Sequence, residues 1–145
     1  VRSGAIGIGL VDRIPASPEL RIVAGSFQPI EKKSVITSEK IEGINRLARK
    51  TMKKIVTNPC LENFLRSCKA FAFESGLASS RVRELIDDAE RAGAIGASQN
   101  MIGEGVHAVV KANMLKEARE AFKSYFNEEK IVVSKIDFQG ARLIS

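Results

Sequence analysis

The sequence GAIGASQNMIGEGVHAVVK, at residues 93–111, decides how we interpret the chain. Small residues crowd its first half, the polar pair Gln99 and Asn100 follows, and a β-branched run at residues 106–110 predicts a strand. A small-residue loop that leads into a strand lets backbone amides approach a ligand, because glycine leaves room and tolerates positive φ. The alternative is a tight turn that only ends a helix at Gly93, since no spacing here matches a strong phosphate-loop pattern.

The length and composition indicate one globular domain. With 145 residues, of which 44% are hydrophobic and 28% charged, the chain is long enough to build its own core. No apolar run approaches the length of a membrane span and no signal-like leader is present, so we expect a soluble cytoplasmic protein. The chain starts with Val1 rather than methionine, and we expect it to be a piece of a longer protein.

Apolar residues at helical spacing predict three consecutive helices. The first starts at Ser38, and the second starts at Asn58, a capping residue followed by a proline. The second helix ends near Gly76, and Ser79 or Ser80 caps the third. We interpret the apolar stripes of these helices as core.

The remaining pattern predicts strands and one more helix. Residues 1–18 suit an extended segment or an edge hairpin, and alternation over residues 20–26 suits a half-buried strand. A helix opens at Asn113, and residues 130–136 and 141–144 predict two strands paired as a hairpin. This order predicts an α+β fold, with a mainly antiparallel sheet and helices packed on one face.

The cysteines and acidic residues give little support for a metal site. Cys60 and Cys68 fall two turns apart on one predicted helix, which forbids a disulfide, and a single histidine leaves a zinc site short of ligands. Asp87, Asp88 and Glu90 lie on the outer face of the third helix, where a solvated face is favoured over a metal site. We therefore predict no metal ligands.

The net charge of +6 invites a nucleic-acid interpretation, but the basic residues are spread along the chain. A solvated helix face is the simplest interpretation of their one local cluster, and a groove for a nucleotide or phosphate, or an RNA site, is the alternative. The cluster consists of Arg46, Arg49, Lys50, Lys53 and Lys54.

Known catalytic motifs are absent from this sequence: it has no phosphate loop, nucleophile elbow or His-Glu-x-x-His. His107 lies in the middle of a predicted strand, on the face opposite to its neighbours, and a structural histidine is favoured over a general base. The residues alone predict an α+β domain with one suggestive loop.

The order of several segments resembles the C-terminal half of the archaeal pantoate kinases, a branch of the GHMP kinase superfamily. The segments are NPCLENFLRSCKAFAFESGL (residues 58–77), an acidic helix and GASQNMIGEGVHAVV (residues 96–110). The closing FQGARLIS is similar to the superfamily's glycine-hairpin ending, and the opening VRSGAIGIGLVDRIP resembles the passage between the two halves. The pattern Ser98, Met101 and Gly103 favours the pantoate branch.

The resemblance implies a GHMP kinase C-terminal domain with ferredoxin-like topology, in which residues 1–145 form one domain and residues 1–18 lead in from the missing N-terminal half. It also implies transfer of the γ-phosphoryl group of ATP to the hydroxyl group of pantoate, giving 4-phosphopantoate for coenzyme A synthesis. The superfamily's ATP loop is not in this sequence. We therefore expect the N-terminal half to bind most of the ATP and Mg²⁺, and the chain alone to be inactive.

The third conserved motif of the superfamily falls on Gly96, Ala97, Ser98, Gln99 and Gly103. The resemblance implies that Ser98 and Gln99 hydrogen-bond the acceptor or the phosphates and that the glycines allow close approach. The usual motif is richer in glycine than this one. The catalytic base is not identified.

Other functions remain open at this point. The acceptor of a related kinase would be homoserine or mevalonate, and a stand-alone ligand-sensing or dimerising module would use the same loop for regulation. An RNA-binding domain would use the basic helix face. For the kinase we expect no nucleic-acid or membrane partner, and an apolar patch beside the loop that supports self-association as a homodimer.

Overall fold

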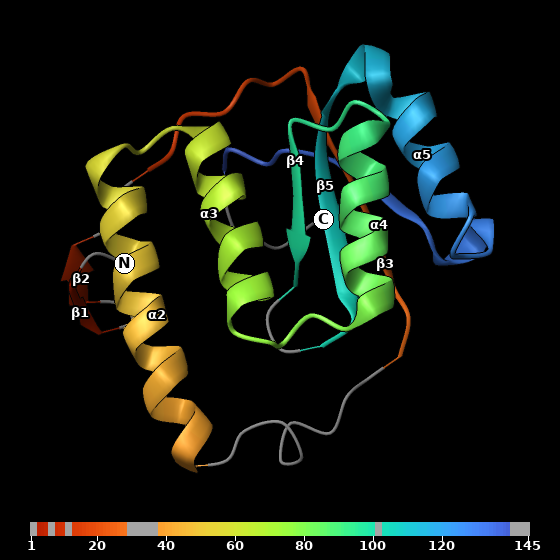
Figure 1. The fold of residues 1–145 in the computed structure, drawn as a ribbon. Coiled ribbons are helices and arrows are strands. Elements are labelled where there is room, and N and C mark those ends of the chain that lie inside the picture. Colours follow the sequence, from red (N-terminus) through yellow and green to blue (C-terminus); the bar gives the residue numbers. More distant parts are fainter. Residues whose placement is uncertain (1–2, 6–7, 11–12, 29–37, 101–102, 140–145) are drawn as a thin grey trace.

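A computed structural model describes residues 3–5, 8–10, 13–28, 38–100 and 103–139. Within these residues the chain forms a four-stranded sheet, four α-helices and a separate two-stranded hairpin (Figure 1). The hairpin consists of β1 (Ser3–Ala5) and β2 (Ile8–Leu10), and the sheet of β3 (Leu20–Ser26), β4 (Gly96–Gln99), β5 (Gly105–Lys111) and β6 (Val132–Lys135). The helices are α2 (Ser38–Thr57), α3 (Leu61–Glu74), α4 (Ser80–Arg91) and α5 (Leu115–Lys123), with short 3₁₀ turns at Ala112–Met114 and Glu128–Lys130.

The sheet has the strand order β4-β5-β3-β6, and each neighbouring pair is antiparallel. Along the chain the sheet strands and helices alternate as β-α-β-β-α-β, with three helices in the first crossover, which is the ferredoxin-like arrangement. The predicted α+β class and the mainly antiparallel sheet are confirmed. The predicted hairpin near the N-terminus is confirmed in β1 and β2.

The main core lies between one face of the sheet and helices α4 and α5. Alternate residues of β5, Val106, Ala108 and Val110, face this core, and Val23 of β3 lies beside Ala108. The largest side chain that is fully buried there is Phe122 of α5. Side chains alternate between the two faces of each strand, so every second residue is apolar and points to this core. Burial of these apolar groups holds α4 and α5 on this face of the sheet.

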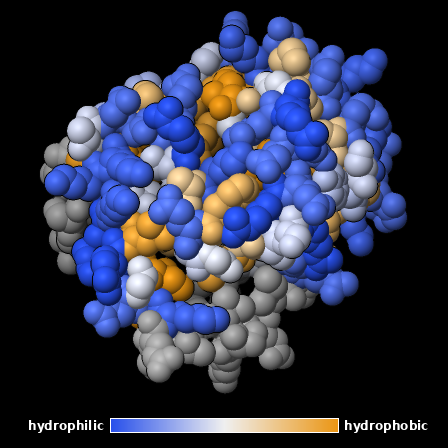
Figure 2. Space-filling model, in the orientation of Figure 1, coloured by the Kyte–Doolittle hydropathy of each residue, from blue (hydrophilic) through white to orange (hydrophobic). Residues whose placement is uncertain are grey.

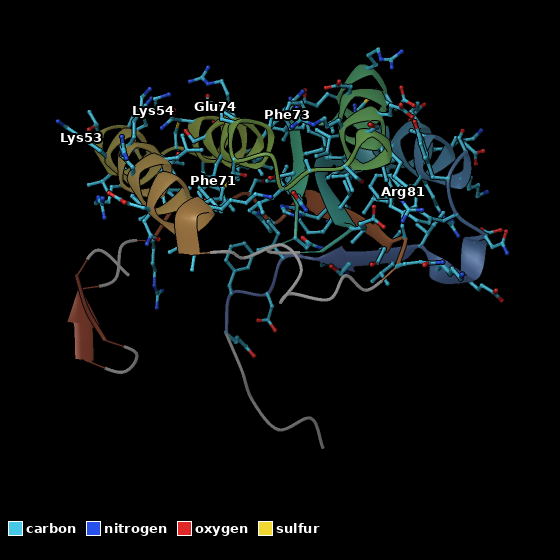
Figure 3. The ribbon with its side chains drawn as sticks, turned by 60° about the horizontal axis from the view of Figure 1, so that its bottom comes forward. Lys53, Lys54, Phe71, Phe73, Glu74 and Arg81 are labelled. Atoms are coloured by element: carbon cyan, nitrogen blue, oxygen red, sulfur yellow. The ribbon has the colours of Figure 1, made fainter. Side chains whose placement is uncertain are left out.

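Helices α2 and α3 extend the helical layer beyond the β4 edge of the sheet (Figures 1 and 3). Leu65 of α3 joins Leu20 and Val109 in a second, smaller cluster. The prediction of a half-buried strand over residues 20–26 is therefore incomplete, because Leu20 on one face and Val23 on the other are both buried. Strand β3 contributes to both clusters.

The predicted helix starts are largely confirmed. Helix α2 begins at Ser38, and Ser79 is the N-cap of α4. The second helix begins at Leu61, later than predicted, because Cys60 and not Asn58 is its N-cap; the backbone oxygen of Asn58 instead accepts a hydrogen bond from the side-chain Nδ2 of Asn63 at 2.8 Å. The second helix ends close to Gly76, as predicted, and that glycine has a φ of 71°.

Two strand predictions need correction or fall outside the described residues. Residues 96–99, predicted as part of a small-residue loop, form strand β4. The strand predicted at residues 130–136 is shorter, because Glu128–Lys130 forms a 3₁₀ turn before β6 begins at Val132. The strand predicted at residues 141–144 lies outside the described part of the chain, and β6 pairs with β3.

Candidate functional site

The segment that leads into the candidate site begins with a helix end. Gly93 has a φ of 95° and its amide donates to the backbone oxygen of Glu90 at 3.0 Å, while the amide of Ala94 donates to Ala89 at 3.1 Å. Left-handed geometry after the last helical residue favours glycine and satisfies the free carbonyl groups of the helix. The helix therefore ends in a tight turn at Gly93, and the chain passes from this turn into β4.

Gly96 and Ala97 are packed against other elements. A Cβ atom at Gly96 would lie 2.7 Å from the Cβ of Leu65, so α3 rests directly on the backbone of β4. Ala97 is fully buried in the main core, and its amide donates to the carboxylate of Glu90 at 3.4 Å. In this structure the small side chains at these two positions allow close helix packing.

Ser98 and Gln99, the next two residues, line a cavity between α2, α3 and the end of β4. Ser98 is 1% exposed and Gln99 is 8% exposed. The cavity has a volume of about 410 Å³, which is in the usual range for small-molecule sites. Hydrophobic residues come to the surface between α2 and α3 in the space-filling view (Figure 2).

The turn between β4 and β5 is fixed by hydrogen bonds at its base. The amide of Asn100 donates to the backbone oxygen of Gly105 at 2.7 Å, and the side-chain amide of Gln99 donates to the backbone oxygen of Gly103. A Cβ atom at Gly105 would lie 3.2 Å from Asn100, whereas one at Gly103 would meet, among the described residues, only the backbone oxygen of Asn100 at 4.0 Å. The structure thus brings Gly103 to Gln99, and Gly103 retains room for a close approach.

Glu104 anchors this turn to the start of α4. Its carboxylate accepts hydrogen bonds from the Nε of Arg81 and the hydroxyl of Ser79, both at 2.8 Å, and its backbone oxygen accepts from Phe27. The guanidinium of Arg81 also lies over the Phe27 ring, 4.8 Å from its centroid. The Arg81 guanidinium holds the pKa of Glu104 below its ordinary value. This buried carboxylate therefore keeps its charge.

His107 follows in β5, on the sheet face opposite to Val106 and Ala108, as predicted. Its Nδ1 lies 2.5 Å from the Oδ1 of Asn100, and Ser98 is its cross-strand neighbour. Burial lowers the pKa of His107, which favours the neutral imidazole. His107 is thus held in one orientation next to the strand that carries Ser98.

The predicted basic cluster lies away from this cavity. Lys53 and Lys54 project from the outer side of α2, whereas Phe71 projects from α3 in the opposite direction, toward the cavity (Figure 3). Arg46, one member of the cluster, has an exposed i,i+4 partner in Glu42 at 3.9 Å. The cluster therefore forms an exposed helix face.

Comparison with known proteins shows which chains this one is similar to. No family model matches the sequence. The pantoate kinase of Methanocaldococcus jannaschii is 28% identical over 115 residues, which cover 79% of this chain and 42% of that protein. The chain is therefore similar in sequence to a pantoate kinase over most of its own length. It spans less than half the length of this curated relative.

The fold of the chain also occurs in solved phosphotransferases. A phosphotransferase related to the CoA biosynthesis pathway aligns with a TM-score of 0.72 at 17% identity, over 91% of this chain and 45% of that protein. The mevalonate kinase of L. major aligns with a TM-score of 0.55 at 10% identity, over 80% and 41% of the two chains. These similarities confirm the GHMP kinase C-terminal domain fold.

The acidic side chains of α4 offer little to a metal ion, because they are already paired. Asp87 and Glu90 both pair with Lys69 at 2.7 Å, and Asp88 accepts from Arg91 and from the hydroxyl of Tyr125. In the described ranges, three or more metal-ligating side chains nowhere come together, and the cavity has no charged lining residue there. These residues do not fit Mg²⁺, and we derive no step through it.

Two further findings concern cysteines and membranes. Cys60 and Cys68 are free thiols, and Cys68 lines the cavity, where burial raises its pKa. Among the helices that the structure describes, none is both long and apolar enough to cross a membrane.

Sequence reasoning missed the residues that hold the site in place. The pair of Glu104 and Arg81 joins positions 23 residues apart, and neither belongs to a recognisable motif. The contact of Asn100 with His107 crosses a turn whose geometry the sequence does not reveal. The cavity walls were predicted as core, because apolar residues at helical spacing give the same signal in both cases.

Proposed function

We propose that this chain is the C-terminal domain of a longer ATP-dependent kinase that phosphorylates the hydroxyl group of pantoate to 4-phosphopantoate in coenzyme A biosynthesis. The observation that carries this proposal is the 28% identity to a pantoate kinase over most of the chain. The fold similarity to a phosphotransferase related to CoA biosynthesis supports it independently of sequence. In this proposal residues 1–145 form one domain, and residues 1–18 lead in from the N-terminal half.

The proposed substrate- or phosphate-binding residues are Gly96, Ala97, Ser98, Gln99 and Gly103. Ser98 and Gln99 lie at the cavity, and Gly103 lies in the turn that the side-chain amide of Gln99 contacts. Gly96 and Ala97 hold the strand against α3 and the core. Phosphoryl transfer depends mainly on positioning and charge neutralisation, so a rigid strand end suits the role.

ATP and Mg²⁺ are assigned mainly to the N-terminal half. The cavity of this chain presents no charged side chain among the residues described, so the charge neutralisation that phosphoryl transfer requires has to come from elsewhere. We therefore expect the chain alone to lack kinase activity. ATP-dependent phosphorylation of pantoate by the isolated chain would refute this assignment.

The N-terminal half also needs a surface on which to pack. Five large apolar side chains remain exposed in the described residues, on α2, on β6 and at Phe138, and those that lie together under the missing half would form part of such a surface. They are Ile41, Met52, Val132, Val133 and Phe138. Without its partner half the chain is expected to self-associate, and a monodisperse monomer at high concentration would count against this.

Homoserine or mevalonate as the acceptor is the second candidate. The fold similarity to mevalonate kinase is compatible with it, but that similarity is at 10% identity and concerns the fold alone. The sequence similarity to a pantoate kinase favours pantoate.

A coupled ATPase assay on the full-length parent tests both candidates. Pantoate, homoserine and mevalonate are offered separately to the wild type, to Ser98→Ala and to Gln99→Ala. We expect turnover with pantoate and a fall of about tenfold or more in kcat/KM for either variant, since each loses a buried hydrogen-bonding group. Ser124→Ala, at an exposed position of the same residue type, is the control. Turnover with homoserine or mevalonate instead would keep the kinase function and change the assigned acceptor. If none of the three acceptors is phosphorylated, the proposal is refuted.

A further inference from the structure

The cavity beside Ser98 and Gln99 offers no partner to the acid group of the acceptor. Pantoate, homoserine and mevalonate each carry a carboxylate besides the hydroxyl group. Burying a carboxylate among uncharged groups is costly unless a cation pairs with it, and the described lining of this cavity has no charged side chain. The cation for this carboxylate therefore has to lie outside the cavity.

Arg81, in the first turn of α4, is a cation at the β4–β5 turn. The side-chain amide of Gln99 contacts Gly103 in that turn. The next residue, Glu104, accepts a hydrogen bond from the Nε of Arg81 at 2.8 Å and another from its Nη2. In Figure 3, which brings this end of the molecule forward, Arg81 lies beside the start of α4. Two contacts thus connect the end of β4 to a guanidinium group.

The guanidinium of Arg81 meets Glu104 with only one side of its fork. Nε and Nη2 face the carboxylate, so two of the five N–H donors are used there and the edge between Nη1 and Nη2 points the other way. The ring of Phe27 lies 4.8 Å from the guanidinium and fixes its plane. The side chain of Arg81 is 47% exposed, whereas that of Glu104 is 8% exposed. The free edge is therefore the part of this pair that a ligand can reach.

The neighbouring Arg83 is occupied by a different task. Its Nε donates to the backbone oxygen of Ala78 at 3.0 Å, and its Nη2 donates to that of Phe73 at 2.7 Å. Its guanidinium also lies over the Phe73 ring, 4.6 Å from the centroid. These contacts hold the connection between α3 and α4. Of the two arginines near the start of α4, Arg81 is the one beside the β4–β5 turn.

The free edge of Arg81 fits a carboxylate better than a chain of phosphates. Two parallel N–H groups match the two oxygens of a planar carboxylate. A phosphate also fits such a fork, but Glu104 stays ionised beside it, as its lowered pKa indicates. The repulsion from Glu104 grows with the charge of the ligand, and the phosphates of ATP carry several charges where a carboxylate carries one. The pair therefore favours a monoanion.

We propose that Arg81 binds the carboxylate of the acceptor substrate through the Nη1 and Nη2 edge of its guanidinium, beside the β4–β5 turn. This inference rests on the proposed kinase function and deepens it. Arg81 is a specificity-determining residue, and Glu104 and Phe27 orient it. A guanidinium that is already oriented loses little conformational freedom when it binds. An acceptor without a carboxylate leaves this edge unused, so Arg81 selects acids over neutral alcohols.

Kinetics of the full-length parent with pantoate and with the primary amide of pantoate test this assignment. Arg81→Lys keeps a positive charge beside Glu104 but removes the planar edge. The double variant Arg81→Gln with Glu104→Gln removes both charges, so that no buried carboxylate is left unpaired. In both variants we expect the ratio of kcat/KM for pantoate to that for the amide to fall about tenfold or more, with little change in the KM for ATP.

The ratio separates ligand binding from structural support. If Arg81 only supported the turn, both acceptors would lose activity alike and the ratio would stay at its wild-type value, which would overturn the proposal. A raised KM for ATP with an unchanged ratio would assign the edge to phosphate instead and would also overturn it. The matched control is Arg119→Gln with Glu128→Gln, since Arg119 is 41% exposed and pairs with a glutamate outside this turn. We expect the wild-type ratio in the control, and an equal fall there would contradict the assignment.

Isothermal titration of the same parent with pantoate, in the absence of ATP, distinguishes this inference from the kinase proposal. Turnover of pantoate with an unchanged ratio would refute the inference and leave the kinase function standing. With no turnover of any acceptor the kinase function is refuted, and pantoate binding that Arg81→Lys weakens would still support the carboxylate site. Without turnover, pantoate binding that is absent, or that Arg81→Lys leaves unchanged, would refute both.

Discussion

Gly96 of β4 and Leu65 of α3 lie in such close contact that a Cβ atom at position 96 would be 2.7 Å from the Cβ of Leu65. Both residues are buried, and the neighbouring atoms belong to the stem of a core side chain rather than to a flexible end. The contact joins the helix that forms one cavity wall to the strand that carries Ser98 and Gln99. The geometry of the cavity therefore depends on a glycine.

The substitution Gly96→Ala is expected to destabilise the chain by about 1–3 kcal/mol, because the added methyl group overpacks the contact with Leu65. Gly43→Ala is the matched control, since the same change in α2 meets no atom within 4 Å and removes a glycine from a helix interior. That control is expected to stabilise the chain by about 0.5–1 kcal/mol. Urea unfolding of the three proteins measures both effects, and a Gly96→Ala variant as stable as wild type would contradict the packing argument.

Strand β4 shows why small residues mislead a sequence-based prediction. Strands are recognised by β-branched and aromatic residues, whose preference reflects packing on a pleated surface. Strand β4 has none of these, because Gly96 must admit α3 and Ala97 must fit beneath α4. Strand β5, with three valines, carries the usual signal and is predicted correctly. The loop prediction failed where packing demanded small side chains.

The candidate site was predictable only in part, for a related reason. Ser98 and Gln99 are the polar residues of a motif, and the structure places both at the cavity. Periodicity identifies the apolar side of α2 but does not tell whether another helix covers it. Because α2 packs chiefly against α3, residues such as Met52 border a cavity and do not fill a core. Long-range pairs such as Glu104 with Arg81 leave no local pattern at all.

The two partners of the Glu104–Arg81 pair are expected to differ in their effect on stability. The side chain of Glu104 is 8% exposed, whereas that of Arg81 is 47% exposed. Arg81→Ala leaves a buried carboxylate without its cation, while Glu104→Gln leaves a guanidinium that water can reach. We expect Arg81→Ala to lower the Tm more than Glu104→Gln does. The reverse order in thermal unfolding would contradict the assignment of Glu104 as the buried partner.

The same pair is expected to make stability depend on acidity. The hydrogen bond from Arg81 lowers the pKa of Glu104 from its ordinary value of 4.5. A carboxyl group whose pKa is lower in the folded state stabilises the fold above its unfolded pKa, and this contribution is lost as the pH falls through the folded pKa. Glu104→Gln is expected to flatten that part of the acid dependence. Equal acid slopes of Tm in the variant and the wild type would rule this out.

Tyr125 is expected to titrate unusually late. Burial and the hydrogen bond that its hydroxyl donates to Asp88 at 2.5 Å raise its pKa to about 12. Because the protein has one tyrosine and no tryptophan, the absorbance of tyrosinate reports this group alone. A raised folded pKa gives stability that is complete below the unfolded pKa and is lost as the pH rises through the folded pKa. We expect Asp88→Asn to lower the midpoint of the tyrosinate titration, but not to the ordinary pKa of 10.0, because the ring stays buried. A wild-type titration midpoint at 10.0 would refute the raised pKa of Tyr125.

His107 is expected to remain neutral to a lower pH than an exposed histidine. Burial lowers its pKa from 6.5, and with Asn100 Oδ1 as the acceptor, Nδ1 carries the ring hydrogen. Between the folded and unfolded pKa values the unfolded chain binds more protons, so stability is complete above the unfolded pKa and falls as the pH drops below it.

The one histidine of the chain allows its titration to be followed directly by nuclear magnetic resonance. We expect a midpoint below 6.5 in the wild type and a higher one in Asn100→Asp, because a carboxylate beside Nδ1 favours the imidazolium. His107→Gln is expected to remove the corresponding loss of stability in urea unfolding between about pH 7 and pH 5. A wild-type midpoint at or above 6.5 would contradict the burial of this ring.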